Sequence, residues 1–159
     1  MSWTDIERVI GAYQGSLESA LVRGDRPYPM GLAMTKKDQE NFEIVRTAMT
    51  RHATSSEDVR SLAEKVRIRT RDCDAAGMVA LLPRSVAFEL IGRKDPEDPL
   101  ASEHVGFSHA EHLTSGVRTW ILEIPNMVPV GEWILVNHGI RSKLPTFIDN
   151  RRYTAGGTA

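Results

Sequence analysis

The segment RIRTRDCDAAG, residues 67–77, is the part of the chain whose residue types and spacing could do chemistry. Apolar residues alternate with arginines and predict a strand over residues 66–70, and an apolar helical run is expected over residues 78–93. A helix N-terminus offers free N–H groups and the positive end of the helix dipole. A polarised carbonyl could be held there while Asp72 or Asp74 acts as base or nucleophile, although either carboxylate could instead be a simple N-cap.

The single cysteine, Cys73, lies between these two aspartates. Neighbouring negative charge opposes formation of a thiolate, so the chemistry is expected from one of the two aspartates and not from the cysteine. One cysteine also excludes an internal disulfide and suits a reducing compartment.

The same segment resembles a family motif. RTRDCDAAGMV is similar to the active-site segment of hot-dog fold acyl-CoA thioesterases of the 4-hydroxybenzoyl-CoA thioesterase type, in which a first strand runs into D-x-D-x-x-G-x-V or D-C-D-P-A-G-x-V and then a central helix. SVAFELIGR (85–93) resembles the start of that helix, PVGEWILV (129–136) a sheet strand, and RRYTAGG (151–157) a hairpin turn before the last strand. The resemblance covers residues 65–157.

The resemblance implies hydrolysis of an acyl-CoA thioester without a cofactor. Asp74 would be the catalytic carboxylate, and Gly77 with the N–H groups at the helix start would polarise the thioester carbonyl. A dimer or tetramer is implied, because the family's site commonly lies between subunits. The residues expected to contact the substrate are Asp72, Met78, Val79, Arg69 and Arg71. The two arginines would bind the phosphates of coenzyme A, or they would simply lie on a solvated face of the sheet.

Three histidines, His104, His109 and His112, lie within nine residues. On a helix, His109 and His112 would share a face at i, i+3, and His104 could join them. Three imidazoles with a carboxylate can bind zinc or iron, which leaves a metal-dependent enzyme as an alternative to incidental histidines on a solvated segment.

These residues need elements to position them. The first 24 residues predict a helix that begins with a capping box of Thr4 and Glu7. A second helix is predicted over Thr35–His52, from the spacing of its apolar residues, and a short third helix from Val59 to Val66.

The later part of the chain is expected to be β-rich. Strands are predicted over Val117–Ile124 and Gly131–Ile140, which are rich in β-branched and aromatic residues, and a last strand over residues 146–154. The expected fold is α+β, with a helical N-terminal extension over residues 1–60. Residues 61–159 would form a hot-dog-like antiparallel sheet around a central helix.

Composition sets broad limits on function. The chain has 159 residues, 41% of them hydrophobic, and a formal net charge of −1, which gives no electrostatic case for nucleic acid or an anionic membrane. No signal peptide or membrane-spanning run is recognisable, so a cytoplasmic protein is expected. The amphipathic N-terminal segments also leave open a non-enzymatic, mainly helical assembly or interaction protein.

Overall fold

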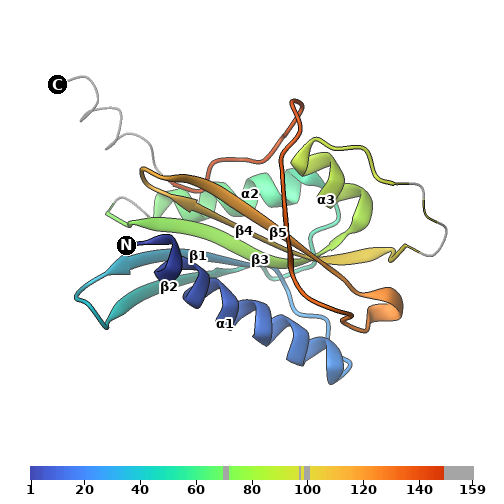
Figure 1. Ribbon diagram of the computed structural model, residues 1–159, viewed down its shortest axis with the longest axis horizontal. Helices are drawn as coiled ribbons and strands as arrows, with labels where there is room; N and C mark the ends of the chain where they lie inside the picture. Colours follow the sequence, from blue (N-terminus) through green and yellow to red (C-terminus); the bar gives the residue numbers. More distant parts are fainter. Residues whose placement is uncertain (70–71, 97, 99–100, 149–159) are drawn as a thin grey trace.

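Figure 1 shows the computed structural model of the chain, which describes residues 1–69, 72–96, 98 and 101–148. Within these ranges the strands form one antiparallel sheet in the order β2-β1-β3-β4-β5-β6. In chain order the elements are α1 Trp3–Val22, β1 Met30–Lys36, β2 Phe42–Ala48, α2 Ser56–Ile68, β3 Ala75–Pro83, α3 Arg84–Ile91, β4 His104–His112, β5 Gly116–Glu123, the 3₁₀ helix η1 Pro125–Met127 and β6 Ile134–Val136.

Helices cover both faces of the sheet. In Figure 1, α1 lies on one side of the sheet, and α2 and α3 lie on the other. The α1 side buries apolar residues that recur at helical spacing, among them Ile6, Ile10 and Leu17. The opposite side buries Leu62 and Val66 of α2 against the sheet. The α+β class, the N-terminal helix and the antiparallel sheet expected from the sequence are therefore confirmed.

The start of α1 lies two residues earlier than expected. Ser2 is the N-cap: its hydroxyl accepts the N–H of Asp5, and the Asp5 carboxylate accepts the N–H of Ser2, both at 3.1 Å. The predicted box of Thr4 and Glu7 is therefore wrong, because the same i, i+3 pattern of polar residues occurs twice in this stretch.

The predicted helix over Thr35–His52 is wrong, because this stretch forms a β-hairpin with its neighbours. Strands β1 and β2 pair from Met30↔Ala48 to Lys36↔Phe42. The turn between them is made by Asp38, whose carboxylate accepts the N–H groups of Glu40 and Asn41, at 2.9 Å each. Such side-chain-to-backbone bonds favour a turn over a continuous helix. Residues 1–60 are consequently not wholly helical, and two of their segments belong to the common sheet.

The predicted strand over residues 66–70 is also wrong, since α2 continues to Ile68. Val59, Leu62 and Val66 are buried at helical spacing, which decides the helix against the alternating arginines. The helix predicted over residues 78–93 is wrong in its first part. Residues 78–83 lie in β3 and not in a helix, and the helix begins only at Arg84. A fully buried strand is as continuously apolar as a helix core, so its sequence is ambiguous.

Strand β5 confirms the prediction over Val117–Ile124, and α3 confirms the helical part of residues 85–93. Only Ile134–Val136 of the second predicted strand is β structure. Residues 139–148, here called the C-terminal strap, then cross the side of the sheet that carries α3, with Lys143 N–H donating to Leu90 O at 2.9 Å. The expected last strand over residues 146–154 falls mostly outside the described residues. Among the described helices, none is long and apolar enough to cross a bilayer.

Candidate functional site

Asp74 lies in the loop just before β3, and both its carboxylate and its backbone make hydrogen bonds to neighbouring strands. The carboxylate Oδ2 accepts the backbone N–H of Lys36 at 2.8 Å. Its own N–H donates to Met34 O, and its carbonyl accepts from Leu113 N–H, both at 2.9 Å. Asp74 therefore joins the ends of β1, β3 and β4, and no helix N-terminus follows it.

Gly77 lies in the middle of the sheet, paired with Leu32 on one side and Ala110 on the other. A Cβ atom on Gly77 would come within 2.0 Å of the carbonyl oxygen of His109, so the strands approach too closely here for a side chain. The helix that was expected to begin beside Gly77 begins at Arg84 instead.

The other expected substrate contacts do not converge. Met78 and Val79 are buried on opposite faces of β3, in the cores under α2 and α1 respectively. Asp72 is exposed, and Arg69 is an exposed residue at the C-cap of α2. Arg71 lies outside the described residues.

The histidine cluster is divided by the same alternation. His104, His109 and His112 lie on strand β4, not on a helix, so the middle one faces away from the other two. His112 donates its Nε2–H to Met1 O beside α1, whereas His109 is in ring contact with Phe147 on the opposite face. Across the described residues, no group of three or more His, Cys, Asp or Glu side chains could hold a metal ion.

A buried chain of polar side chains crosses β4 and β5 on the α3 side. His109 Nδ1 lies 2.8 Å from Thr119 Oγ1, and Thr119 Oγ1 lies 2.7 Å from His138 Nε2. At the other end, His109 Nε2 lies 3.5 Å from Glu111 Oε1. Thr119 has no exposed surface, and only 1% of His109 is exposed. The chain therefore links a buried carboxylate to the half-buried His138.

The hydrogens in this chain can be ordered in one consistent direction. If Glu111 is ionised, it accepts from His109 Nε2–H, which leaves Nδ1 free to accept the Thr119 hydroxyl hydrogen. Thr119 Oγ1 then accepts from His138 Nε2–H. A hydroxyl bonded to an imidazole, which is itself oriented by a carboxylate, is the arrangement of a nucleophile, a general base and an orienting group.

Glu111 also anchors the C-terminal strap. Its carboxylate accepts the N–H of Phe147, at 2.8 Å to Oε2, and the N–H of Ile148 at 3.1 Å. The ring of Phe147 packs 5.6 Å from the ring of His109, measured between centroids. The strap thus closes the polar chain from solvent and satisfies the buried carboxylate in place of a cation.

His138 is the member of the chain nearest to solvent. Partial burial lowers the pKa of His138 below its ordinary value of 6.5, and the neighbouring His109 lowers it further. Both effects favour the neutral ring, which suits a donor to the threonine oxygen with one nitrogen left unprotonated.

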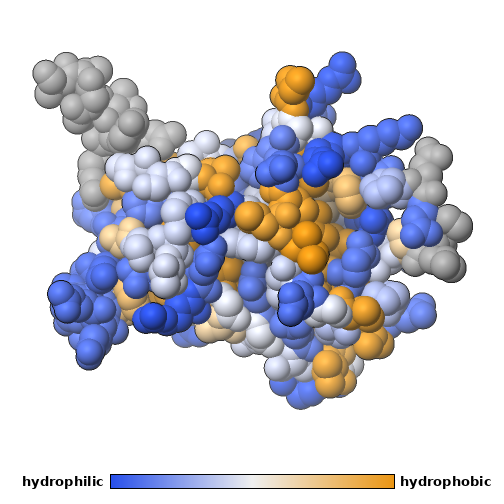
Figure 2. All heavy atoms as spheres, in the orientation of Figure 1, coloured by the Kyte–Doolittle hydropathy of each residue, from blue (hydrophilic) through white to orange (hydrophobic). Residues whose placement is uncertain are grey.

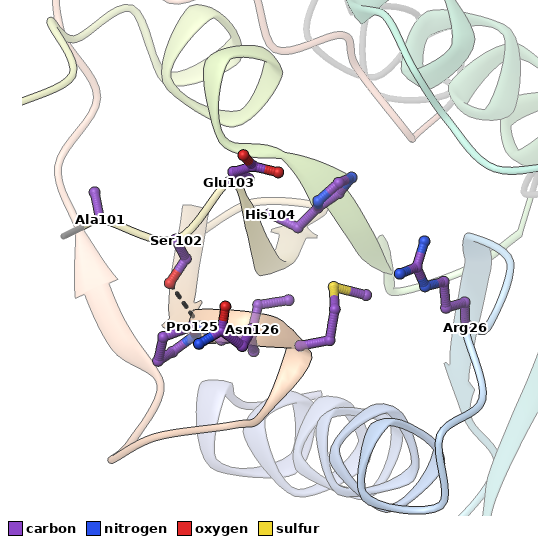
Figure 3. Close-up of a pocket in the computed structure, with 9 residues that line it drawn as sticks. Arg26, Ala101, Ser102, Glu103, His104, Pro125 and Asn126 are labelled. Carbon is purple, nitrogen blue, oxygen red and sulfur yellow. Dashed lines mark hydrogen bonds between the residues drawn. The ribbon is translucent and has the colours of Figure 1, made fainter. Parts of the chain in front are cut away.

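A cleft of about 470 Å³ lies elsewhere, at the start of β4 and the end of β5. Figure 3 shows Arg26 across the opening from Ser102 and Asn126, with the ring of His104 between them. Ser102 is buried and engaged: its hydroxyl donates to Glu123 at 2.9 Å and accepts the N–H of Ile124 at 3.2 Å.

The floor of this cleft has an unusual backbone. Asn126 and Met127 both have positive φ, 51° and 65°, and within the described chain they are the non-glycine residues that do. Asparagine tolerates this left-handed region, but methionine has no side-chain group that compensates for it. Each such residue costs about 1–3 kcal/mol, and such strain is concentrated at functional sites.

Comparison of the chain with models of protein families, with curated proteins and with solved structures finds no match. The resemblance to hot-dog thioesterases therefore stays a prediction.

The sequence suggested His109 only as a metal ligand, with Glu111 among the carboxylates beside the histidines, and gave no sign of Thr119 as a partner of His109. The alternation along β5 does place Thr119 on the same face as Ile121, but nothing in the sequence reveals which residues lie opposite. Asn126 and Met127 were also missed, because positive φ at these residue types has no sequence signal.

Proposed function

We propose that the protein hydrolyses acyl thioesters at the polar chain of Thr119, His109 and Glu111. The observation that supports this is the 2.8 Å contact between the Thr119 hydroxyl and His109 Nδ1, with Glu111 beyond the other ring nitrogen. Acyl-CoA remains the proposed substrate and a hot-dog-like fold the proposed relationship, with Thr119 in the role first expected of Asp74. The sheet with a helix packed on each face is compatible with that relationship.

The proposed reaction has two balanced steps. Thr119 Oγ1 attacks the carbonyl carbon as its proton passes to His109 Nδ1; the C–S bond breaks, and the thiolate takes that proton. Water then attacks the acyl-threonine ester and gives a proton to His109, which returns it to Thr119 Oγ1 as the carboxylic acid leaves. Glu111 stabilises the imidazolium in both steps. Because Thr119 is fully buried, His138 and the C-terminal strap must move aside to admit the thioester.

The test is release of free thiol from a panel of acyl-CoA esters by the purified protein. Thr119→Val, which keeps the shape and removes the hydroxyl, should lower turnover at least about 100-fold, within the range for loss of such groups. Thr119→Ser should retain turnover, and Thr50→Val, at an exposed threonine, is the matched control. Folding of each variant is checked by circular dichroism.

Two outcomes would refute this proposal. The first is the absence of turnover above background for every ester. The second is full activity in Thr119→Val together with its loss in Asp74→Asn, which would return the chemistry to the originally expected carboxylate.

The second candidate is a non-enzymatic assembly protein that pairs with a second copy of itself. Strand β6 lies at the edge of the sheet and carries exposed Ile134 and Leu135, with Val128 and Val130 exposed just before it. Figure 2 shows apolar side chains gathered near the middle of the face over which this segment passes. Open edges with apolar side chains favour strand-to-strand pairing. Light scattering after size exclusion should give a dimer that Leu135→Lys converts to a monomer.

A further inference from the structure

We propose that the cleft bounded by Arg26, Glu103 and Asn126 binds a small zwitterion, either a free amino acid or a dipeptide. Its carboxylate would lie on Arg26 and its ammonium group on Glu103. This site is separate from the polar chain of Thr119, and the proposal does not depend on thioester hydrolysis.

The cleft holds polar side chains that are available to a ligand. Within the described chain, the side chains of Arg26, Glu103, His104 and Asn126 make no hydrogen bond or ion pair, although all four line one cleft. They offer a guanidinium, an imidazole and an amide for an anion, and one carboxylate for a cation. A ligand with one charge of each sign matches this set, whereas Glu103 would repel a second negative charge.

Arg84 lies near the cleft, but its guanidinium is already paired and cannot bind a ligand. Arg84 is only 11% exposed and is held by Asp95 and by Glu123, both at 2.8 Å. Glu123 also accepts the hydroxyl of Ser102. These contacts leave Arg26 as the guanidinium that can turn to a carboxylate, where its planar fork suits bidentate binding.

The backbone beneath the cleft supports a binding role. Asn126 and Met127 hold consecutive left-handed conformations, and both residues line the cleft. Met127, Ile124 and Pro125 supply apolar surface beside these polar groups. A volume of about 470 Å³ exceeds that of one amino acid, so the cleft also has room for a dipeptide.

The experiment is isothermal titration of the intact protein with four probes: L-alanine, dialanine, propionate and ethylamine. At least one of the two zwitterions should bind at least tenfold more tightly than propionate or ethylamine, because only a zwitterion satisfies both Arg26 and Glu103. Arg26→Gln should weaken the zwitterion tenfold or more. Glu103→Gln should reduce the affinity for the zwitterion to that of propionate for the same variant, and should leave propionate binding unchanged or tighter, because a nearby negative charge is removed.

Arg23→Gln is the matched control, since Arg23 is an exposed arginine three residues away that pairs with Asp25 outside the cleft. It should leave binding unchanged. Asn126→Gly keeps the left-handed backbone without strain and removes the amide, so it should weaken binding without lowering the melting temperature.

The proposal is overturned if neither zwitterion binds at millimolar concentration, or if propionate binds as tightly as alanine. Equal losses in Arg23→Gln and Arg26→Gln would also overturn it, because the effect would then be one of general surface charge.

Discussion

Gly77 was expected to help polarise a thioester carbonyl, whereas the structure places it at a close approach of two central strands. The substitution Gly77→Ala tests which of these two roles the glycine has. The added Cβ would lie 2.0 Å from His109 O and 3.0 Å from Ala110 Cα, against an ordinary contact of 3.4 Å or more. Relief of the shorter contact alone requires β3 and β4 to separate locally by about 1.4 Å. Strand β3 is also paired with β1, so it cannot move without disturbing a second ladder.

The size of the effect follows from this geometry. Overpacking a well-packed core costs about 1–3 kcal/mol, and a clash with backbone on a central strand belongs at the upper end of that range. A loss of about 3 kcal/mol lowers the melting temperature of a domain of this size by about 6–12 °C. Because marginal domains have about 5–15 kcal/mol of stability in total, the variant should still fold.

Urea unfolding followed by circular dichroism measures this loss. The control is Gly15→Ala in α1, where the new methyl group meets nothing within 4 Å. That variant should gain about 0.5–1 kcal/mol from the helix preference of alanine. A Gly77→Ala protein with unchanged stability and abolished thioester hydrolysis would refute the packing argument and restore the catalytic role.

Three further predictions concern the polar groups Glu111, His138 and Asp5. Glu111→Gln should destabilise the protein by about 2–3 kcal/mol, because charged acceptors of the strap N–H groups are lost, and should speed hydrogen exchange at Phe147 and Ile148. Burial and His109 lower the pKa of His138 in the folded state. As the pH falls, His138 is therefore protonated in the unfolded chain before it is protonated in the folded protein. Stability should therefore fall as pH drops below 6.5, and His138→Gln should flatten this dependence in urea titrations between pH 5 and about 7.5. The Asp5 pKa is lowered to about 2, chiefly by the Ser2 N–H, so its stabilisation of α1 should be lost as pH falls from 3.8 towards 2; Asp5→Asn should lose that dependence in acid melts.

The sequence predicted the elements whose stability comes from a single clear periodicity. The helix near the N-terminus, the helical stretch from Val59 to Val66 and the strand over Val117–Ile124 each have one buried face or a strongly β-prone composition. Local pattern decides such segments, because the same residues form the pattern and the core.

Segments with two compatible patterns were decided by the tertiary structure. Phe42, Val45 and Met49 fit a helix, yet pairing with β1 makes Phe42–Ala48 a strand. The apolar run from Met78 to Leu82 is buried on both faces of β3, so no alternation marks it as a strand. Strand pairing is a long-range choice, and local sequence carries little information about it.

The segment of residues 67–77, predicted as a strand running into a loop, shows the same division between sequence and fold. Its residue types alone suggested Asp74 as a catalytic group, but folding places that carboxylate on the Lys36 N–H. The polar chain depends instead on register: β4 and β5 pair His109 with Thr119, and the segment after β6 brings His138 and, in the strap, Phe147 to them. The sequence determined which chemical groups exist and which strand faces they occupy, whereas only the packing of distant segments decided which groups meet.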